Sequence, residues 1–187
     1  MKTLAILGSR NPVGQTAQAA DAVLKGVESV GGITDRVFLP KQTLNHCRQC
    51  DDDGWGLCKK EGHCIVEDSF ALIVDKIKSA DVVVFATPVY FFDMSESMGA
   101  LINRLCRVCF QHPQPGINSK RVLALCIAGG SGSGAIECCF RLEKMLSRCK
   151  FNIVEMIPVK RQNLADKMPW LQKIGEAIAI YKSTSEK

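Results

Sequence analysis

Two kinds of apolar pattern alternate along this chain from beginning to end. Short apolar runs rich in β-branched residues are typical of strands, and apolar residues that recur every three or four positions are typical of amphipathic helices. The runs predict strands at residues 3–7, 33–39, 82–86, 121–128 and 152–159. The helical repeats fall at residues 16–30, 70–77, 98–108, 136–149 and 169–181.

This alternation of strands and helices predicts an α/β fold. Consecutive strand–helix–strand units form parallel sheets with right-handed crossovers, and they place helices on both faces of the sheet. We therefore expect a doubly wound five-stranded parallel sheet. Residues 1–187 are expected to form a single domain, with a cysteine-rich loop inserted at about residues 40–67.

Several residue types predict where the helices begin and end. Gly31 and Gly32 are a typical C-terminal stop for the first helix, and Asp68 is expected to cap the second. Asp93 and Glu96 have the spacing of a capping pair before the third. Proline is favoured in the first turn of a helix, so a final helix is expected to start at Pro169.

The unusual loops of this chain all follow predicted strands. They lie at residues 8–16, 47–64, 87–93 and 129–134. In open α/β sheets, ligands bind outside the carboxyl ends of the strands. We therefore expect these four loops to converge on one edge of the sheet.

The strand at 82–86 leads into an unusually apolar exit. Pro88, Tyr90, Phe91 and Phe92 stand where polar turn residues are expected. Exposed aromatic side chains are costly unless something covers them, and a flat conjugated ligand would do so. The alternative is a small hydrophobic cluster under a loop.

The loop at residues 8–16 joins the first strand to the first helix and suits an anion. Backbone N–H groups at a helix N-terminus, the Ser9 and Thr16 hydroxyls and the Arg10 charge could together cradle a terminal phosphate. No Lys-Ser or Lys-Thr pair follows the glycine, so the loop is not a Walker A loop, and it does not fit G-x-G-x-x-G. The alternative is a plain helix-capping loop.

Composition narrows the class of protein. The net charge is +5, with 47% hydrophobic and 23% charged residues and without the long apolar stretch of a membrane span or an export signal. These values predict a soluble protein that binds neither membrane nor nucleic acid. Ten cysteines without an export signal predict reduced thiols in the cytoplasm.

The motifs, in this order, resemble those of the NAD(P)H-dependent FMN reductase and iron–sulfur flavoprotein group of flavodoxin-like proteins. The matching segments are residues 8–16, 47–50, 62–68, 87–91, 100–104 and 129–134, so the resemblance covers roughly residues 3–149. Arg10 stands one place early and Asn11 occupies the family's usual arginine position. Gly99 and Asn103 replace a common lysine and the usual aspartate.

The resemblance implies a flavodoxin-like fold that binds FMN, and it assigns residues to three parts of the cofactor. Ser9 and Thr16 would hold the phosphate, together with Arg10, Asn11, Gly14 and Gln15 of the same loop. Thr87, Pro88, Val89, Tyr90 and Phe91 would border the isoalloxazine ring, and Gly129 and Gly130 would lie along its other edge.

The resemblance also implies chemistry and partners. NAD(P)H would donate hydride, and a flavin, a quinone, a small electrophile or a protein would accept the electrons. No side chain is expected to act as an acid or base, and the family commonly forms homodimers or homotetramers. A non-redox module that has kept only the fold is a further alternative.

The cysteine-rich loop has the spacing Cys47-x2-Cys50-x7-Cys58-x5-Cys64. Four thiolates could ligate a [4Fe–4S] cluster, which would make the protein an electron carrier, or a tetrahedral zinc ion. Iron–sulfur members of the family have only two residues between the second and third cysteines, so a loop without metal is equally open. The other six cysteines lie in helix and strand patterns, where we expect small buried hydrophobes.

Overall fold

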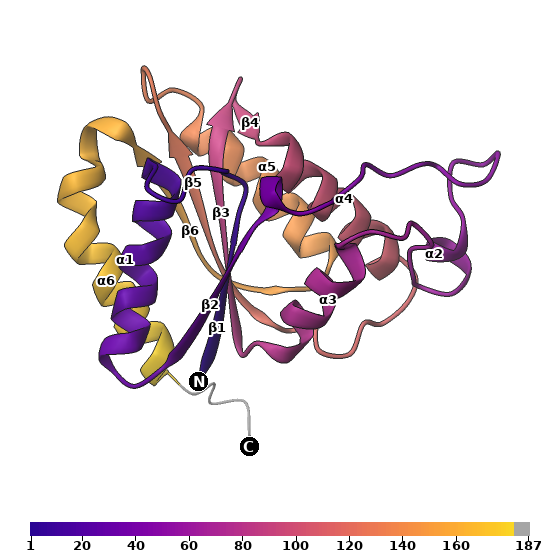
Figure 1. Ribbon diagram of the computed structural model, residues 1–187, viewed down its shortest axis with the longest axis horizontal. Helices are drawn as coiled ribbons and strands as arrows, with labels where there is room; N and C mark the ends of the chain where they lie inside the picture. Colours follow the sequence, from indigo (N-terminus) through magenta and orange to yellow (C-terminus); the bar gives the residue numbers. More distant parts are fainter. Residues whose placement is uncertain (182–187) are drawn as a thin grey trace.

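The predicted strands pair as one parallel sheet in the computed structural model, which describes residues 1–181 (Figure 1). The spatial order is β2-β1-β3-β5-β6. The parallel strands are β1 (Lys2–Leu7), β2 (Ile33–Phe38), β3 (Val82–Tyr90), β5 (Arg121–Ala128) and β6 (Asn152–Lys160). A sixth, two-residue strand, β4 (Asp93–Met94), pairs antiparallel with the end of β3.

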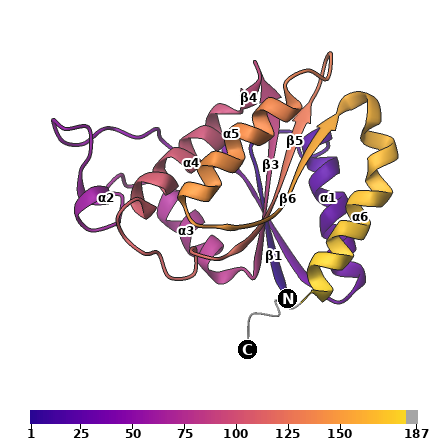
Figure 2. The same cartoon turned by 180° about the vertical axis from the view of Figure 1, so that it is seen from behind.

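Helices cover both faces of the sheet, as expected. On one face lie α1 (Gln15–Ser29) and α6 (Leu164–Ile180). On the other lie α3 (Phe70–Ser79), α4 (Glu96–Cys109) and α5 (Ala135–Arg148), and the reverse view shows the same layers (Figure 2). Three short helices complete the described chain: η1 (Leu39–Lys41), α2 (Leu57–Lys60) and η2 (Arg161–Asn163). The prediction of one domain over residues 1–187 stays a prediction.

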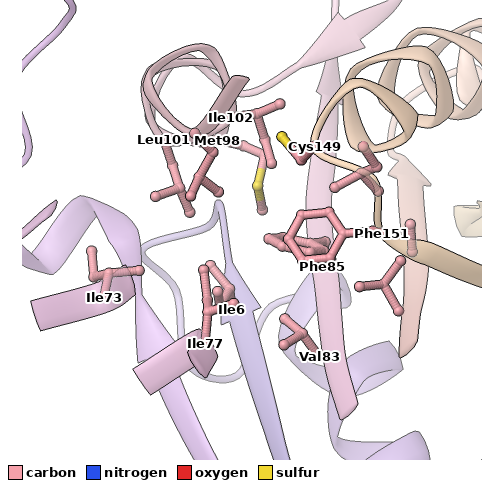
Figure 3. Packing of buried hydrophobic residues seen from close by; sticks show 14 of the residues in the cluster. Ile6, Ile73, Ile77, Val83, Phe85, Met98, Leu101, Ile102, Cys149 and Phe151 are labelled. Atoms are coloured by element: carbon pink, nitrogen blue, oxygen red, sulfur yellow. The ribbon is translucent and has the colours of Figure 1, made fainter. Parts of the chain in front are cut away.

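Alternate residues of each central strand enter two separate cores. In β1, Leu4 and Ile6 join the cluster under α3, α4 and α5, whereas Ala5 and Leu7 join the cluster under α1 and α6. Phe85 of β3 packs edge-on against Phe151, with ring centroids 5.8 Å apart (Figure 3). The strands are apolar on both faces because each face is covered by helices.

The exit of β3 differs from its prediction. We expected a strand ending at residue 86, but β3 continues to Tyr90 and turns back through β4. It pairs with β1 only as far as Ala86, and Val89 and Tyr90 pair with β4 instead. Pro88 lies between these two pairings, a position at which a strand tolerates a residue without an N–H donor.

Three helix starts also differ from prediction. The N-cap of α4 is Ser95, whose hydroxyl accepts a hydrogen bond from the Met98 N–H, while Asp93 lies in β4. The N-cap of α3 is Ser69, and the preceding Asp68 accepts from the Phe70 N–H at 2.9 Å. The last helix begins at Leu164 and contains Pro169; burial of its apolar face offsets the single hydrogen bond that the proline cannot donate.

Two glycines let α1 and α6 approach closely. A Cβ added to Gly26 would lie 1.9 Å from the Gln172 carbonyl oxygen, and one added to Gly175 would lie 2.0 Å from the Val23 carbonyl oxygen. Both atoms belong to backbone, which cannot move aside without separating the helices. Glycine therefore sets the spacing of this helix pair.

We predict that Gly175→Ala lowers the free energy of unfolding by about 1–3 kcal/mol, the usual cost of overpacking, although alanine favours helix. Gly99→Ala is the matched control, because its added Cβ would meet only Met94 Cγ at 4.0 Å. That variant should be more stable by up to about 1 kcal/mol. Urea unfolding measures both; equal effects of the two substitutions would contradict the close approach.

Candidate functional site

The loops after β1, β3 and β5 meet at the carboxyl edge of the sheet and enclose a cleft of about 680 Å³. This volume is within the roughly 300–1,000 Å³ range of small-molecule sites. Eleven of the thirteen predicted cofactor residues line the cleft: Ser9, Asn11, Gly14, Gln15, Thr16, Pro88, Val89, Tyr90, Phe91, Gly129 and Gly130. Phe92, Ile127, Ser131 and Ser133 also line it and were missing from the predicted set.

The first part of the cleft is the start of α1. The N-cap Gly14 offers no side-chain acceptor, and the first turn contains no acidic residue. Asn11 stabilises the preceding loop, because its Oδ1 accepts from the Val13 N–H at 3.0 Å and its carbonyl accepts from the Gly14 N–H at 3.3 Å. The helix therefore presents its positive end to the cleft, which suits a phosphate.

Arg10 lies outside this cleft. It lines a neighbouring pocket of about 520 Å³, which also includes Glu96 and shares Tyr90 and Phe91 with the cleft. Asn11, at the family's usual arginine position, lines the cleft itself. The one-residue displacement in the sequence thus corresponds to a different orientation of the arginine.

Thr87 is buried behind the cleft. Its Oγ1 accepts from the Ser95 N–H at 3.0 Å and so joins β3 to the start of α4. A Cβ on Gly8 would lie 2.3 Å from Ser95 Oγ, so the first loop needs glycine at this position. The sequence analysis did not predict that Ser95 is the N-cap of α4. The sequence feature that could have indicated it is a serine three residues before the first buried residue of a helix.

The aromatic exit of β3 is a two-residue hairpin turn. Tyr90 pairs with Asp93, and the two residues between them, Phe91 and Phe92, have φ values of +50° and +67°. Two positive φ values are the type I′ pattern, which strongly favours Asn-Gly or Gly-Gly. A bulky residue in the left-handed region costs about 1–2 kcal/mol, and such strain concentrates at functional sites.

We predict that Phe91→Asn raises the free energy of unfolding by about 0.5–1 kcal/mol, because asparagine tolerates the left-handed region. The side chain of Phe91 is 99% exposed, so little packing is lost. Phe140→Asn, an exposed aromatic residue in α5, is the control and should give no gain. Thermal or urea unfolding tests the pair; a destabilised Phe91→Asn protein would show that the turn is not strained.

The glycine-serine loop forms the opposite wall. Gly130, Gly132 and Gly134 all have positive φ, and a Cβ on Gly134 would lie 2.9 Å from Phe92 Cα. The loop therefore approaches the aromatic turn closely. Its backbone groups could approach a planar ligand from the side opposite the phenylalanines.

The cysteine-rich loop lies at a second place, beyond the far end of α4 (Figure 1). Cys47, Cys50, Cys58 and Cys64 all line one cavity of about 20 Å³, together with Arg104 and Arg107. The four loops therefore do not converge on a single site as predicted. The cysteine loop departs because it is long enough to cross α4 and pack against its C-terminal half.

Arg104 and Asp68 form a fully buried ion pair. Arg104 donates to both carboxylate oxygens of Asp68, at 2.7 and 3.1 Å, and its side chain is 1% exposed. It also donates to Cys64 Sγ at 3.3 Å and lies 4.2 Å from the Phe70 ring centroid. Burial alone would raise the pKa of Asp68, but the hydrogen bonds that it accepts from Arg104, Asn45 and Phe70 lower the pKa to about 2.

Arg107, one turn further along α4, holds the segment between the second and third cysteines. It donates to the Gly54 carbonyl at 2.7 Å and lies 4.8 Å from the Trp55 ring centroid. Trp55 in turn stacks on Phe110 at 5.1 Å. Burial raises the pKa of the Cys58 thiol, and the nearby Arg107 charge opposes that rise.

The four cysteine thiols of this pocket can be compared with the ligands that a zinc ion and a [4Fe–4S] cluster require. Four sulfurs around one zinc ion lie about 3.8 Å apart, given Zn–S bonds of about 2.3 Å. Among residues 1–181, no three His, Cys, Asp or Glu side chains are grouped so as to hold a metal ion. Four cysteine thiolates are the donor set of a [4Fe–4S] cluster, and four cysteines line this pocket. The cavity has room for about one water molecule, so such a cluster requires outward movement of the exposed Cys50 side.

The remaining cysteines lie in the core, as predicted. Five are buried and Cys106 is half-buried, with its sulfur 3.6 Å from Cys149 Sγ. All ten cysteines are free thiols. No described helix is sufficiently long and apolar to cross a membrane.

Comparison with known proteins agrees with this geometry. The sequence profile of the NADPH-dependent FMN reductases matches residues 1–168. An iron–sulfur flavoprotein of Archaeoglobus fulgidus is 30% identical over 105 residues, which are 56% of this chain and 46% of that protein. The chain spans about half the length of the first curated relatives that it matches.

Solved structures share the fold at low sequence identity. The structure of RosB with a bound 8-demethyl-8-formylriboflavin-5'-phosphate intermediate has a TM-score of 0.73 and 16% identity, and the match covers 95% of this chain and 76% of that one. A flavodoxin from the domain Archaea has a TM-score of 0.61 and 14% identity, with 96% of each chain covered. The predicted flavodoxin-like fold is confirmed.

Proposed function

Because this chain belongs to the NADPH-dependent FMN reductase family, we propose that it binds FMN in the cleft and is an NAD(P)H-dependent oxidoreductase. The observation that supports this most strongly is the meeting of three features in one cleft. These are the uncapped start of α1, the exposed aromatic turn at Phe91 and Phe92, and the glycine loop at 129–134. A phosphate, an aromatic ring and a polar ring edge are what these features would recognise.

Each wall would perform a separate task. Ser9, Asn11 and the first-turn N–H groups of α1 would hold the phosphate, and Thr16 lies in the same turn. Tyr90 and Phe91 would cover one side of the ring system, and Gly129 and Gly130 would bring backbone groups to its edge. When bound, FMN supplies hydride acceptance from the nicotinamide donor and delivery of one or two electrons to an acceptor.

The substrates proposed are NAD(P)H as donor and a flavin, quinone, small electrophile or protein as acceptor. No side chain of the cleft is assigned to acid or base chemistry. Tyr90 and Phe92 are both partly exposed at the rim, so they would limit which acceptors reach the ring.

The test is an FMN titration followed by steady-state oxidation of NADPH and NADH. We expect stoichiometric binding of FMN, a visible flavin spectrum and turnover with at least one quinone or flavin acceptor. A colourless protein that takes up no FMN would refute the proposal. Binding without turnover for any acceptor would favour the non-redox alternative.

The cysteine pocket supports a second function, that of an iron–sulfur flavoprotein acting as an electron carrier. Four thiols and two arginines surround one cavity, and curated relatives are named iron–sulfur flavoproteins. Cys47, Cys50, Cys58 and Cys64 would ligate a [4Fe–4S] cluster, which would supply one-electron transfer. Iron and acid-labile sulfide analysis of anaerobically prepared protein tests this; absence of both removes it.

Assembly and location are also proposed. Phe91, Phe92, Ile136 and Phe140 are exposed apolar residues on the aromatic turn and the neighbouring α5, and they would be covered in a homodimer or homotetramer. Ten free thiols are consistent with a reducing cytoplasm. Sedimentation equilibrium of the FMN-loaded protein would test the assembly, and a monomer at micromolar concentration would contradict it.

A further inference from the structure

We propose that Arg104 and Arg107 set the reduction potential of the group held by the four-cysteine pocket. Arg104 would act through its hydrogen bond to Cys64, and Arg107 through its charge beside Cys58. This inference rests on the second proposed function. It assigns a positioning and tuning role to two residues of α4 that contribute no ligand.

The first support is the hydrogen bond from Arg104 Nη2 to Cys64 Sγ at 3.3 Å. The guanidinium is held in place because Nη1 donates to Asp68 and to the Asn45 carbonyl, while Nη2 shares its two hydrogens among Cys64, Asp68 and the Val66 carbonyl. Arg104 Nε is buried without a hydrogen-bond partner. The pocket therefore contains an immobile guanidinium N–H group in contact with a ligand sulfur, and Asp68 balances the charge of that guanidinium.

The second support is the way in which Arg107 accommodates the unusual cysteine spacing. Seven residues separate Cys50 from Cys58. Arg107 binds this segment at the Gly54 carbonyl, at 2.7 Å, and contacts the Trp55 ring. As a result, Cys58 lines the same cavity as Cys47 and Cys64 in spite of the longer spacing.

Arg107 brings a positive charge to a pocket whose loop also contains three acidic residues. Asp51, Asp52 and Asp53 lie in the same loop, but Lys60 pairs with Asp51 at 3.0 Å and Lys59 pairs with Asp53 at 3.1 Å. Those lysines are exposed, whereas Arg104 and Arg107 face the cavity. Four thiolates and an iron–sulfur core become more negative on reduction, so the positive charge of Arg107 and the N–H···S bond from Arg104 favour the reduced state.

Removing the Arg107 charge should lower the reduction potential of the cluster. In Arg107→Gln protein reconstituted anaerobically, the cluster should be harder to reduce by at least tenfold in its one-electron equilibrium, which is about 59 mV more negative. Arg107→Lys keeps the charge and should recover part of the shift. Arg36→Gln, which removes an exposed arginine paired with Asp21 on another part of the surface, should leave the potential unchanged.

Arg104 needs a variant that does not leave Asp68 alone in the core. The paired variant Arg104→Met with Asp68→Asn removes both charges, and it should shift the potential in the same direction as Arg107→Gln. Its folding is checked by far-ultraviolet circular dichroism. Arg104→Lys is the second variant, because it keeps a cation beside Asp68 but loses the planar set of N–H donors that reaches Cys64. An unchanged potential in the iron-loaded Arg104 variant would overturn the role of Arg104.

Potentials are measured by dye-mediated titration of the iron–sulfur absorbance, with iron, sulfide and FMN quantified in each sample. An unchanged potential in iron-loaded Arg107→Gln protein would overturn this proposal and leave the cluster function standing. Wild-type protein that takes up neither iron nor sulfide would overturn both. FMN content, read separately, shows whether the flavin proposal survives either result.

Discussion

Asp68→Asn should lower the free energy of unfolding by about 3–5 kcal/mol, the cost of leaving one partner of a buried ion pair uncompensated. The Asp68 side chain is 0% exposed and accepts from Arg104, Asn45 and Phe70. The variant keeps the shape of the side chain but removes the charge that balances Arg104. Because these contacts join the cysteine loop to α3 and α4, the loop should become susceptible to proteolysis at the same time.

Asp35→Asn is the matched control. Asp35 also pairs with a cation, Lys76 at 2.7 Å, but both side chains are 40% or more exposed. An exposed pair of this kind contributes about 0–1 kcal/mol. Urea unfolding at neutral pH compares the two, and losses of equal size would show that the Arg104 pair is not effectively buried.

The same pair gives a pH dependence whose sign follows from the pKa. The pKa of Asp68 is about 2 in the folded protein, below the ordinary aspartate value of 3.8 that applies to the unfolded chain. Its lowered pKa therefore contributes about 2 kcal/mol above roughly pH 5, and this contribution is lost as the pH falls towards 2. The difference in stability between wild type and Asp68→Asn should shrink over that interval; a constant difference between pH 7 and pH 3 would contradict the assignment.

Asn11→Asp should weaken FMN binding about 100-fold, or by about 2.7 kcal/mol. Asn11 lines the cleft and its Oδ1 accepts from the Val13 N–H, a bond that aspartate can also accept. The loop should therefore keep its conformation while a negative charge is placed beside the proposed phosphate. Two unit charges about 5 Å apart repel by about 3 kcal/mol at an effective dielectric constant of about 20.

Two controls test whether the loss of affinity is caused by repulsion of the FMN phosphate. Riboflavin lacks that group, so its affinity for Asn11→Asp should equal its affinity for wild type. Asn152→Asp, at the exposed amino-terminal end of β6, adds the same charge at the opposite end of the sheet from the cleft and should leave FMN affinity unchanged. Flavin fluorescence quenching gives all of these constants. Equal weakening of riboflavin and FMN would mean that the substitution disturbs the cleft rather than the phosphate position.

The sequence predicted most of the sheet because its signal is local. Buried parallel strands must be apolar on both faces, so most of the length of β1, β3 and β5 is a continuous apolar run. Connections in such folds are right-handed and short, which leaves few topologies for five strands alternating with helices. Most of the predicted cofactor residues surround one cleft for a related reason, because loops after parallel strands meet at one edge.

Helix boundaries and the aromatic turn were less predictable. A serine, an aspartate and a glutamate near the start of α4 offer competing caps, and only the pairing of β3 with β4 removes Asp93 from the competition. The two turn positions are occupied by Phe91 and Phe92, whereas a type I′ turn is normally signalled by asparagine, aspartate or glycine. The turn forms because the pairing on either side of it requires two positive φ values, which is a tertiary constraint.

The orientation of Arg10 and the place of the cysteine loop were also decided by the tertiary structure. Neighbouring loop residues such as Arg10 and Asn11 can line different pockets, and no periodicity in the sequence predicts the pocket that each side chain enters. The spacing of the cysteines alone suggested a departure from the family. Packing of Trp55 on Arg107 and Phe110 brings Cys58 back to the other cysteines.

The chain by itself thus determined the fold class, the edge of the sheet that carries the cleft and the residue types available there, because these follow from local hydrophobic patterns. Only the tertiary structure decided the buried bonds of Arg104 to Asp68 and Cys64. Those bonds join residues 36 and 40 positions apart in the sequence. They form because the cysteine-rich loop packs against the C-terminal half of α4, and this packing is not predicted by any local sequence pattern.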